Sequence, residues 1–355
     1  MRFCLDLSHH PWTRELDPRL AADATLRAVR IADEAGLDSV WISEDPDGWD
    51  AFAVLGAAAR ETARLRLGTG VTNPYLRHPN LIAMSVATID QLSAGRAFLG
   101  LGRGQPEWYA RSLGVPVGSP PAVLREVIAL LRQWWQPPHV ASVSGHFTVN
   151  AWHRAVVPVQ AHVPIYLAAV GPRALRLAAE EADGVLIAEF ASLPFLAGII
   201  PQLRQWRAAA GRDPDDFAVF VRTAIEISAR PEAALERRKT LLALINTLPG
   251  MDRHLALPDF DVPALMAQLR QVMHTDEVLA RGGAFIDIRR AADFPAARRL
   301  IPTELIDELS YVGTIEQVRA KLARLAAIGV THVFLTPPGP LEAAEYAALV
   351  EQLNG

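Results

Sequence analysis

Cysteine is almost missing from this chain, since Cys4 is the only one among 355 residues. An intramolecular disulfide is therefore excluded, and we expect a reducing, cytoplasmic location. Lysine is nearly as scarce, because only Lys239 and Lys321 are present and arginine supplies the other basic side chains. The formal net charge of -4 provides no excess of positive charge for nucleic acid or an anionic membrane, and we expect neither as a partner.

Long apolar runs are also missing. No stretch of the sequence reaches the roughly 20 apolar residues that a membrane-spanning helix needs. The first residues, MRFCLDLSHHPW, have too short an apolar run for a signal peptide and no small-residue cleavage site, so we expect a first strand there. Half of the residues are nevertheless hydrophobic, and the length suits either one large barrel or two ordinary domains.

Short β-prone runs alternate with longer runs that have apolar residues at helical spacing. Six strand–helix units of this kind follow one another between residues 2 and 211. A seventh strand is predicted within 215–229, and an eighth within 331–339 follows a helix that Thr314 caps. Because each helix returns the chain to the same end of the sheet, the strands should be parallel. We predict an α/β fold, a single (β/α)8 TIM barrel domain over residues 1–355.

Two segments interrupt this alternation. Residues 136–163 resemble an excursion with a small hairpin, and residues 231–310 are helical, irregular and punctuated by proline. We interpret both as insertions in the barrel, and such insertions usually enclose the substrate side.

In a barrel of this kind the active site lies where the strands end. Asp6, Glu44 and Glu189 close three predicted strands. A carboxylate in a mostly apolar pocket has a raised pKa, which suits proton transfer. The alternatives are an ion pair with Arg103 or Arg173, or a helix cap.

Other motifs at the strand ends are weaker. Asp47 is predicted to cap the helix over 50–63, and capping is also preferred for Asp45. His9 and His10 are adjacent and should point in opposite directions, so we expect no metal site there.

Glycines gather at two neighbouring strand ends, in GTGV (68–71) and GLGRG (100–104). Without Cβ atoms, this main chain could lie close against a flat ring system, or could simply bend at a barrel corner. In VGPRAL (170–175), a glycine precedes a proline at a predicted helix start, which leaves N–H groups open to a phosphate. Arg173 would assist there, or would be a solvated residue of the first helical turn.

The stretch LGTGVTNPYLRHPNLIAMSVATIDQLSAGRAFLGLGRG (67–104) resembles the signature of the luciferase-like monooxygenase superfamily, whose barrels bind FMN or the deazaflavin coenzyme F420. The branch of the methylenetetrahydromethanopterin reductases has similar segments, TNPY-RHP, ATLDE-S-GRA-LG-G and A--GP-AL. The likeness covers residues 1–190 and resumes at 311–335.

This resemblance implies a homodimeric, coenzyme F420-dependent oxidoreductase that transfers a hydride between the deazaflavin and a small organic substrate. A pterin-like compound, an imine or an enone would be such a substrate. The alternatives are an FMN-dependent monooxygenase and a non-catalytic barrel that only binds a flavin.

The resemblance also assigns cofactor-binding residues. A non-prolyl cis peptide between Gly70 and Val71 would bulge against the middle of the cofactor ring, and the segment after the fifth strand would hold the phosphate. The complete set is Gly70, Val71, Thr72, Asn73, Gly102, Arg103, Gly104, Ala168, Val170, Gly171 and Arg173. Arg77 would reach a cofactor phosphate or a dimer partner.

Three residues are the catalytic candidates. Asp6 matches an acid on the first strand of the reductases, and we expect Asp6 and Glu44 to handle the proton. Gln105 stands where the relatives carry an acid, and an amide can orient a ring or substrate but cannot donate a proton at neutral pH. Glu44 and Asp45 replace the Asp-His pair of the related sugar-phosphate dehydrogenases, so the substrate stays open.

Overall fold

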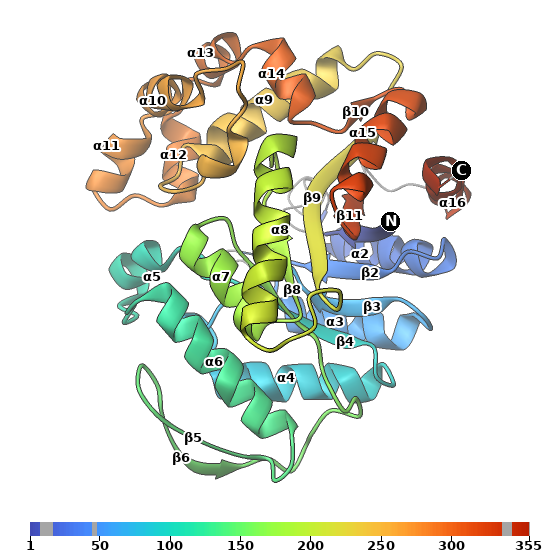
Figure 1. Ribbon diagram of the computed structural model, residues 1–355, viewed down its shortest axis with the longest axis vertical. Coiled ribbons are helices and arrows are strands. Elements are labelled where there is room, and N and C mark those ends of the chain that lie inside the picture. Colours follow the sequence, from blue (N-terminus) through green and yellow to red (C-terminus); the bar gives the residue numbers. More distant parts are fainter. Residues whose placement is uncertain (8–16, 45–47, 336–342, 355) are drawn as a thin grey trace.

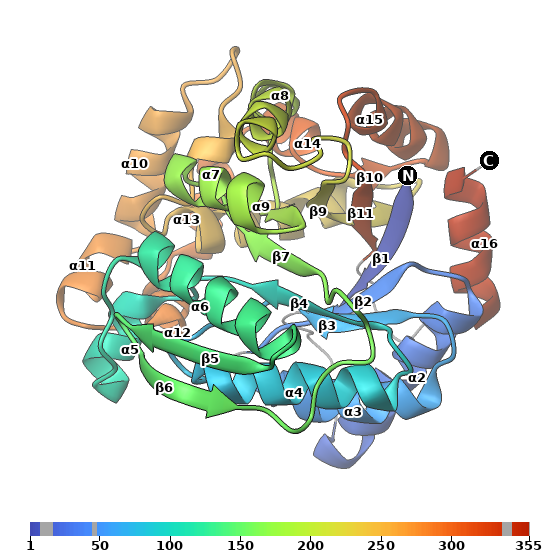
Figure 2. The same ribbon diagram turned by 60° about the horizontal axis from the view of Figure 1, so that its bottom comes forward.

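A barrel of parallel strands forms the centre of the molecule (Figures 1 and 2). The computed structural model describes residues 1–7, 17–44, 48–335 and 343–354. Within them, eight strands close in the order β1–β2–β3–β4–β7–β8–β9–β11, because β11 pairs with both β9 and β1. They are β1 (Arg2–Asp6), β2 (Ser39–Ile42), β3 (Arg66–Thr69), β4 (Ala97–Leu101), β7 (Ile165–Ala168), β8 (Gly184–Ile187), β9 (Ala218–Ile227) and β11 (His332–Leu335). The predicted (β/α)8 barrel is confirmed.

The helices that surround this barrel lie where the apolar periodicity predicts them, except the helix at residues 343–354, which was not predicted. They are α2 (Pro18–Glu34), α3 (Ala51–Glu61), α4 (Pro79–Leu92), α6 (Pro120–Trp135), α7 (Pro172–Glu181), α8 (Leu193–Ala209), α15 (Ile315–Ala327) and α16 (Ala343–Asn354). A short helix after β4, α5 (Pro106–Leu113), was not predicted. Among the described residues, no helix combines the length and apolarity needed to cross a bilayer.

Of two predicted helix caps, one is confirmed and the other is wrong. Thr314 and Gln317 form a capping box at the start of α15, as predicted. The cap of α3 is Asp50, whose side chain accepts two backbone N–H groups of the first turn. The choice of Asp47 was therefore wrong, and Asp47 itself lies outside the described residues.

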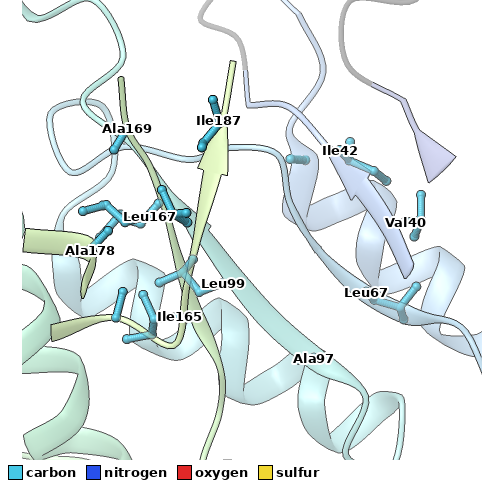
Figure 3. Close-up of a cluster of buried hydrophobic side chains, with 14 of the residues drawn as sticks. Val40, Ile42, Leu67, Ala97, Leu99, Ile165, Leu167, Ala169, Ala178 and Ile187 are labelled. Atoms are coloured by element: carbon cyan, nitrogen blue, oxygen red, sulfur yellow. The ribbon is translucent and has the colours of Figure 1, made fainter. Parts of the chain in front are cut away.

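Alternate strand residues separate two apolar layers, as the period of two requires. One set points outward and packs under the helices, and Figure 3 shows part of it, with side chains of β2, β3, β4, β7 and β8 and Ala178 of α7. The other set fills the barrel lumen: Cys4, Trp41, Phe98, Tyr166, Leu186, Phe220 and Phe334. The Trp41 ring centroid lies 4.6 Å from that of Phe98 and 4.8 Å from that of Phe220. The lumen is therefore a packed core, and a ligand has to bind above it, where the strands end.

Two segments extend beyond the barrel. The strands β5 (Val140–Ser144) and β6 (Thr148–His153) form an antiparallel hairpin beside α6. Six helices and a 3-10 turn with a core of their own lie between β9 and a two-residue strand, β10 (Val312–Gly313). They are α9 (Glu232–Asn246), η1 (Arg253–Leu255), α10 (Val262–Val272), α11 (Thr275–Ala280), α12 (Phe285–Ala291), α13 (Phe294–Leu300) and α14 (Thr303–Glu308), and we refer to residues 232–308 as the helical insertion.

The helical insertion covers part of the end of the barrel where the strands terminate. Arg238 of α9 pairs with Glu189, which follows β8. Arg111 of α5, after β4, donates a hydrogen bond of 2.5 Å to the carbonyl of Leu279 in the insertion. Figure 1 shows the insertion, yellow at α9 and orange from α10 to α14, above α5 and α7.

Candidate functional site

The ends of β3, β4 and β7 meet in a surface with little side-chain bulk. A Cβ atom on Gly102 would lie 2.6 Å from Cγ2 of Val71 and 3.5 Å from Cβ of Ala168. Val71 and Ala168 both pack on the aromatic core of the lumen. We call Val71, Gly102 and Ala168 the apolar floor. Three predicted cofactor-binding residues from separate strands are thus brought together.

Close main-chain approach at this floor explains the glycines before it. The Gly70 N–H donates to the carbonyl of Ile42 at 2.7 Å, and a Cβ on Gly70 would lie only 2.8 Å from Cβ of Trp41. The peptide bond between Gly70 and Val71 is cis. Thr72 then continues the ladder, because its N–H donates to Gly100 and its carbonyl accepts from Gly102.

Thr72 and Asn73 hold the loop rather than line the floor. The side chains of both residues are buried. The Asn73 side-chain oxygen accepts the N–H groups of Tyr75 and Leu76, each at 3.1 Å, which is the geometry of an Asx turn. Both were predicted as part of the cofactor-binding surface, and their observed hydrogen bonds give them the task of shaping it.

Glu44 lies in an ionic network. One of its carboxylate oxygens accepts a hydrogen bond from the Thr72 hydroxyl, and the other accepts from Nε and Nη2 of Arg77 at 2.8 and 2.5 Å. Arg77 also lies 3.0 Å from a carboxylate oxygen of Asp50. Burial by itself lowers the pKa of Arg77, but the hydrogen bonds to Glu44 and Asp50 outweigh it and raise the pKa.

This network corrects the ion pair expected for Glu44 and places Arg77 between Glu44 and Asp50. Glu44 pairs with neither of the arginines that the sequence suggested, and its oxygens are occupied by fixed donors. A carboxylate held in this way is better suited to anchoring the loop through Thr72 than to exchanging protons. Arg77 makes its hydrogen bonds within the chain and thereby ties β2, the β3 loop and α3 together.

Asp6 occupies the lumen side of the same end of the barrel. It is buried, and one of its oxygens lies 3.4 Å from Nε of Arg222 on β9. Nη2 of the same guanidinium donates to the carbonyl of Gly70 at 3.0 Å. Sequence reasoning did not select Arg222. The signal was available, because Arg222 comes two residues after the lumen residue Phe220 and therefore points inward.

The start of α7 forms an open N-terminus near Ala168. Gly171 is its N-cap and Pro172 its first residue, and a Cβ atom on Gly171 would have no neighbour within 4 Å. The first N–H groups of a helix have no partner within the helix. Arg173 is exposed and makes no hydrogen bond or ion pair with the described residues, and Val170 is half-buried beside it. The arrangement can hold an anion.

The segment after β4 turns sharply into α5. Gly104 has a φ of 57°, and a Cβ there would lie 2.5 Å from the Tyr109 hydroxyl, so glycine is required. Gln105 is the N-cap of α5, but its side chain makes no capping hydrogen bond. Both Gln105 and the preceding Arg103 are half-buried.

Glu189 joins the barrel to the helical insertion. Its carboxylate forms a buried ion pair with Arg238, not with either arginine predicted for it. The ring Nε2 of His254 lies 2.9 Å from the Glu189 carbonyl. Burial lowers the pKa of His254 to about 4, so this histidine is neutral at physiological pH. Glu189 is therefore a connecting residue. The predicted positions His9, His10 and Asp45 lie outside the described residues.

The amino-acid sequence is similar to those of a known family and of several characterised proteins. A sequence model of the family described as luciferase-like monooxygenase matches residues 1–332. A putative coenzyme F420-dependent oxidoreductase of Mycobacterium tuberculosis is 32% identical over 344 residues, which are 91% of this chain and 93% of the relative. The 5,10-methylenetetrahydromethanopterin reductase of Methanopyrus kandleri is 27% identical over 327 residues, 88% of each chain.

A solved structure is similar to this chain over nearly its whole length. The coenzyme F420-dependent tetrahydromethanopterin reductase from Methanopyrus kandleri superposes with a TM-score of 0.75 at 25% identity. The match covers 99% of this chain and 97% of that one.

Proposed function

The chain belongs to the luciferase-like monooxygenase family, and from this premise we propose that it is a coenzyme F420-dependent oxidoreductase. It would transfer a hydride between the deazaflavin and a small organic substrate. The relative from Mycobacterium tuberculosis and the solved reductase from Methanopyrus kandleri, both named for coenzyme F420, support this choice of cofactor. The structural observation that carries the proposal is the apolar floor, where three strand ends meet without bulky side chains.

The residues present fit such a cofactor. A planar ring could rest on Val71 and Ala168, which are half-buried, with the buried Gly102 beneath Val71. The open N-terminus of α7 beyond Gly171, together with Arg173, suits a phosphate group. Arg103, Gly104 and Val170 complete the proposed cofactor-binding set.

The chain itself positions groups and handles a proton. Coenzyme F420 supplies the hydride chemistry when bound. Asp6 is our candidate for proton transfer, because it is a carboxylate buried on the lumen side of the floor. Gln105 would donate or accept a hydrogen bond to orient the ring or the substrate. Glu44 would hold Thr72 in position by accepting the hydrogen bond from its hydroxyl group.

The substrate is proposed only by class. A pterin-like compound, an imine or an enone has an electrophilic double bond that accepts a hydride. The helical insertion lies over the end of the barrel and would cover such a substrate. We further propose that residues 1–355 form a single barrel domain. We also propose a cytoplasmic location.

A homodimer is part of the same proposal. Three large apolar residues on one face of α4 are exposed: Leu81, Met84 and Leu92. Three more lie on the segment beside it: Trp152, Val156 and Val159. Hydrogen bonds from Arg154 to Asn80 and from Gln91 to Val157 hold the segment against the helix. We call these six residues the α4 patch. An exposed apolar patch of this kind marks an interaction surface.

Cofactor titration tests the proposed function. We expect the purified protein to quench the fluorescence of coenzyme F420 on binding and to reduce or oxidise it with at least one member of a panel of alcohols, imines and enones. Tight binding of FMN without affinity for coenzyme F420 would instead identify an FMN-dependent monooxygenase. Binding without turnover of any panel member would identify a flavin-binding barrel without catalysis.

A further inference from the structure

Arg222 connects three strands at the end of the barrel, although no motif marks it. Val221, which precedes it, is level with Ile187 at the end of β8. Arg222 therefore lies just above the packed lumen, and its guanidinium carbon is 5.6 Å from the centre of the Phe334 ring. From there it reaches Asp6 on β1 and the Gly70 carbonyl after β3.

Two of the three guanidinium nitrogens are used by these contacts. Nε faces Asp6 at 3.4 Å and Nη2 donates to Gly70 at 3.0 Å. Nη1 makes no hydrogen bond with the described residues. It is not completely buried. The side chain as a whole is 17% exposed, compared with 5% for Asp6. Nη1 is therefore neither fully buried nor hydrogen-bonded within the part of the chain that the structure describes.

The position of Gly70 makes this contact relevant to the apolar floor. Val71 follows Gly70 directly, and its side chain lies over Gly102. A fixed Gly70 carbonyl therefore fixes the start of the floor. A guanidinium suits this task better than an ammonium, because its rigid planar fork can hold two acceptors and still offer a third nitrogen.

We propose that Arg222 is a positioning and binding residue. It anchors the Gly70 carbonyl and Asp6, and it presents Nη1 to a carbonyl oxygen of the ring that rests on the apolar floor. The binding part rests on the proposed function, whereas the anchoring part follows from this chain alone.

Cofactor affinity tests the binding part. Fluorescence titration of coenzyme F420 should give a Kd about tenfold or more higher for Arg222→Met than for the wild type, because a charge-assisted hydrogen bond is lost. Arg222→Lys, which keeps the charge but not the fork, should lie between the two. It also keeps the test decisive if the methionine variant does not fold.

Arg66→Met is the matched control. Arg66 also lies in the lumen, but at the opposite end of the strands, where Nη2 donates to the Tyr166 hydroxyl at 2.6 Å and Nη1 lies 3.6 Å from Asp38. Removing it deletes a lumen arginine far from the floor. Its Kd should stay within about threefold of the wild type.

Hydrogen exchange without any cofactor tests the anchoring part. The amides of residues 70–73 should exchange faster in Arg222→Met than in the wild type or in Arg66→Met. If the wild type bound neither coenzyme F420 nor FMN, the proposed function would fail. The hydrogen-exchange rates would still show whether Arg222 anchors the Gly70 carbonyl. A folded Arg222→Met protein with wild-type exchange and wild-type Kd would overturn the inference.

Discussion

Two carboxylates near the apolar floor, Asp6 and Glu44, differ in their neighbours. Asp6 is buried in the lumen with Nε of Arg222 at 3.4 Å, whereas Glu44 accepts three hydrogen bonds from Arg77 and Thr72. The sequence treats them alike, because each simply ends a strand. The hydrogen bonds of Glu44 suit an anchor of the loop, and we propose Asp6 for proton transfer.

Paired substitutions separate these two tasks. Asp6→Asn keeps the shape and an acceptor for Arg222, so kcat with coenzyme F420 should fall by roughly 100-fold or more while the urea midpoint changes little. Glu44→Gln should lower the free energy of unfolding by roughly 1–3 kcal/mol, because it weakens partly buried, charge-assisted hydrogen bonds. Its pH–rate profile should keep the wild-type pKa values.

A surface pair provides the control for this comparison. Arg30 and Glu61 form an ion pair whose side chains are 45% and 34% exposed. Glu61→Gln should cost less than about 1 kcal/mol, because exposed pairs contribute little. A wild-type kcat in Asp6→Asn would remove Asp6 from the proton pathway.

The strand ends that form the apolar floor depend on the small size of Gly102. In Gly102→Ala, the new Cβ would lie 2.6 Å from Cγ2 of Val71, so the Val71 side chain would have to shift. We expect a loss of roughly 1–3 kcal/mol in unfolding free energy and weaker cofactor binding, measured by urea denaturation and fluorescence titration. Gly56→Ala, on a helix face with no neighbour within 4 Å, should instead stabilise the protein by roughly 0.5–1 kcal/mol. Equal effects in the two variants would contradict this account of the floor.

The junction between β8 and the helical insertion should respond to acid. Burial lowers the pKa of His254 from 6.5 to about 4, so the folded state disfavours its protonation. The unfolded chain then binds more protons between these values, and the stability from the neutral ring, present above pH 6.5, is lost as the pH falls toward 4.

Urea denaturation at several pH values measures this loss. His254→Gln should show a smaller fall in unfolding free energy between pH 6.5 and 4 than the wild type. Some slope should remain, because burial also lowers the pKa of His332 in the lumen to about 4. An unchanged slope in His254→Gln would show that its neutral form does not contribute.

Among the described residues, most of the exposed large apolar side chains belong to the α4 patch. Met84 within it is 44% exposed. If the patch is the homodimer interface, Met84→Asp should place a charge in it and convert the dimer to a monomer in light scattering. Leu20→Asp, on α2 and 57% exposed, should keep the wild-type mass. A wild type that is already monomeric would refute the proposed dimer.

The amino-acid order by itself determined the barrel and marked the strand ends where we propose the site. Apolar periods of two and of three to four residues define strands and helices locally, and their alternation leaves one closed parallel arrangement. Gly70, Gly102 and Gly171 mark close approaches and an open helix start for the same local reason. The missed helix α5 is short, with a break at Gly114 that periodicity does not anticipate.

Only the tertiary structure decided the partners of the charged groups. Glu44 pairs with Arg77 across 33 positions, and Arg222 reaches Gly70 across 152. Such pairs depend on which inward positions of different strands are level after the barrel closes. Register and side-chain direction then set the distances, and no local pattern carries that information. The sequence therefore marked the strand ends where we propose the site, and barrel closure brought Arg222 to Asp6 and to the Gly70 carbonyl.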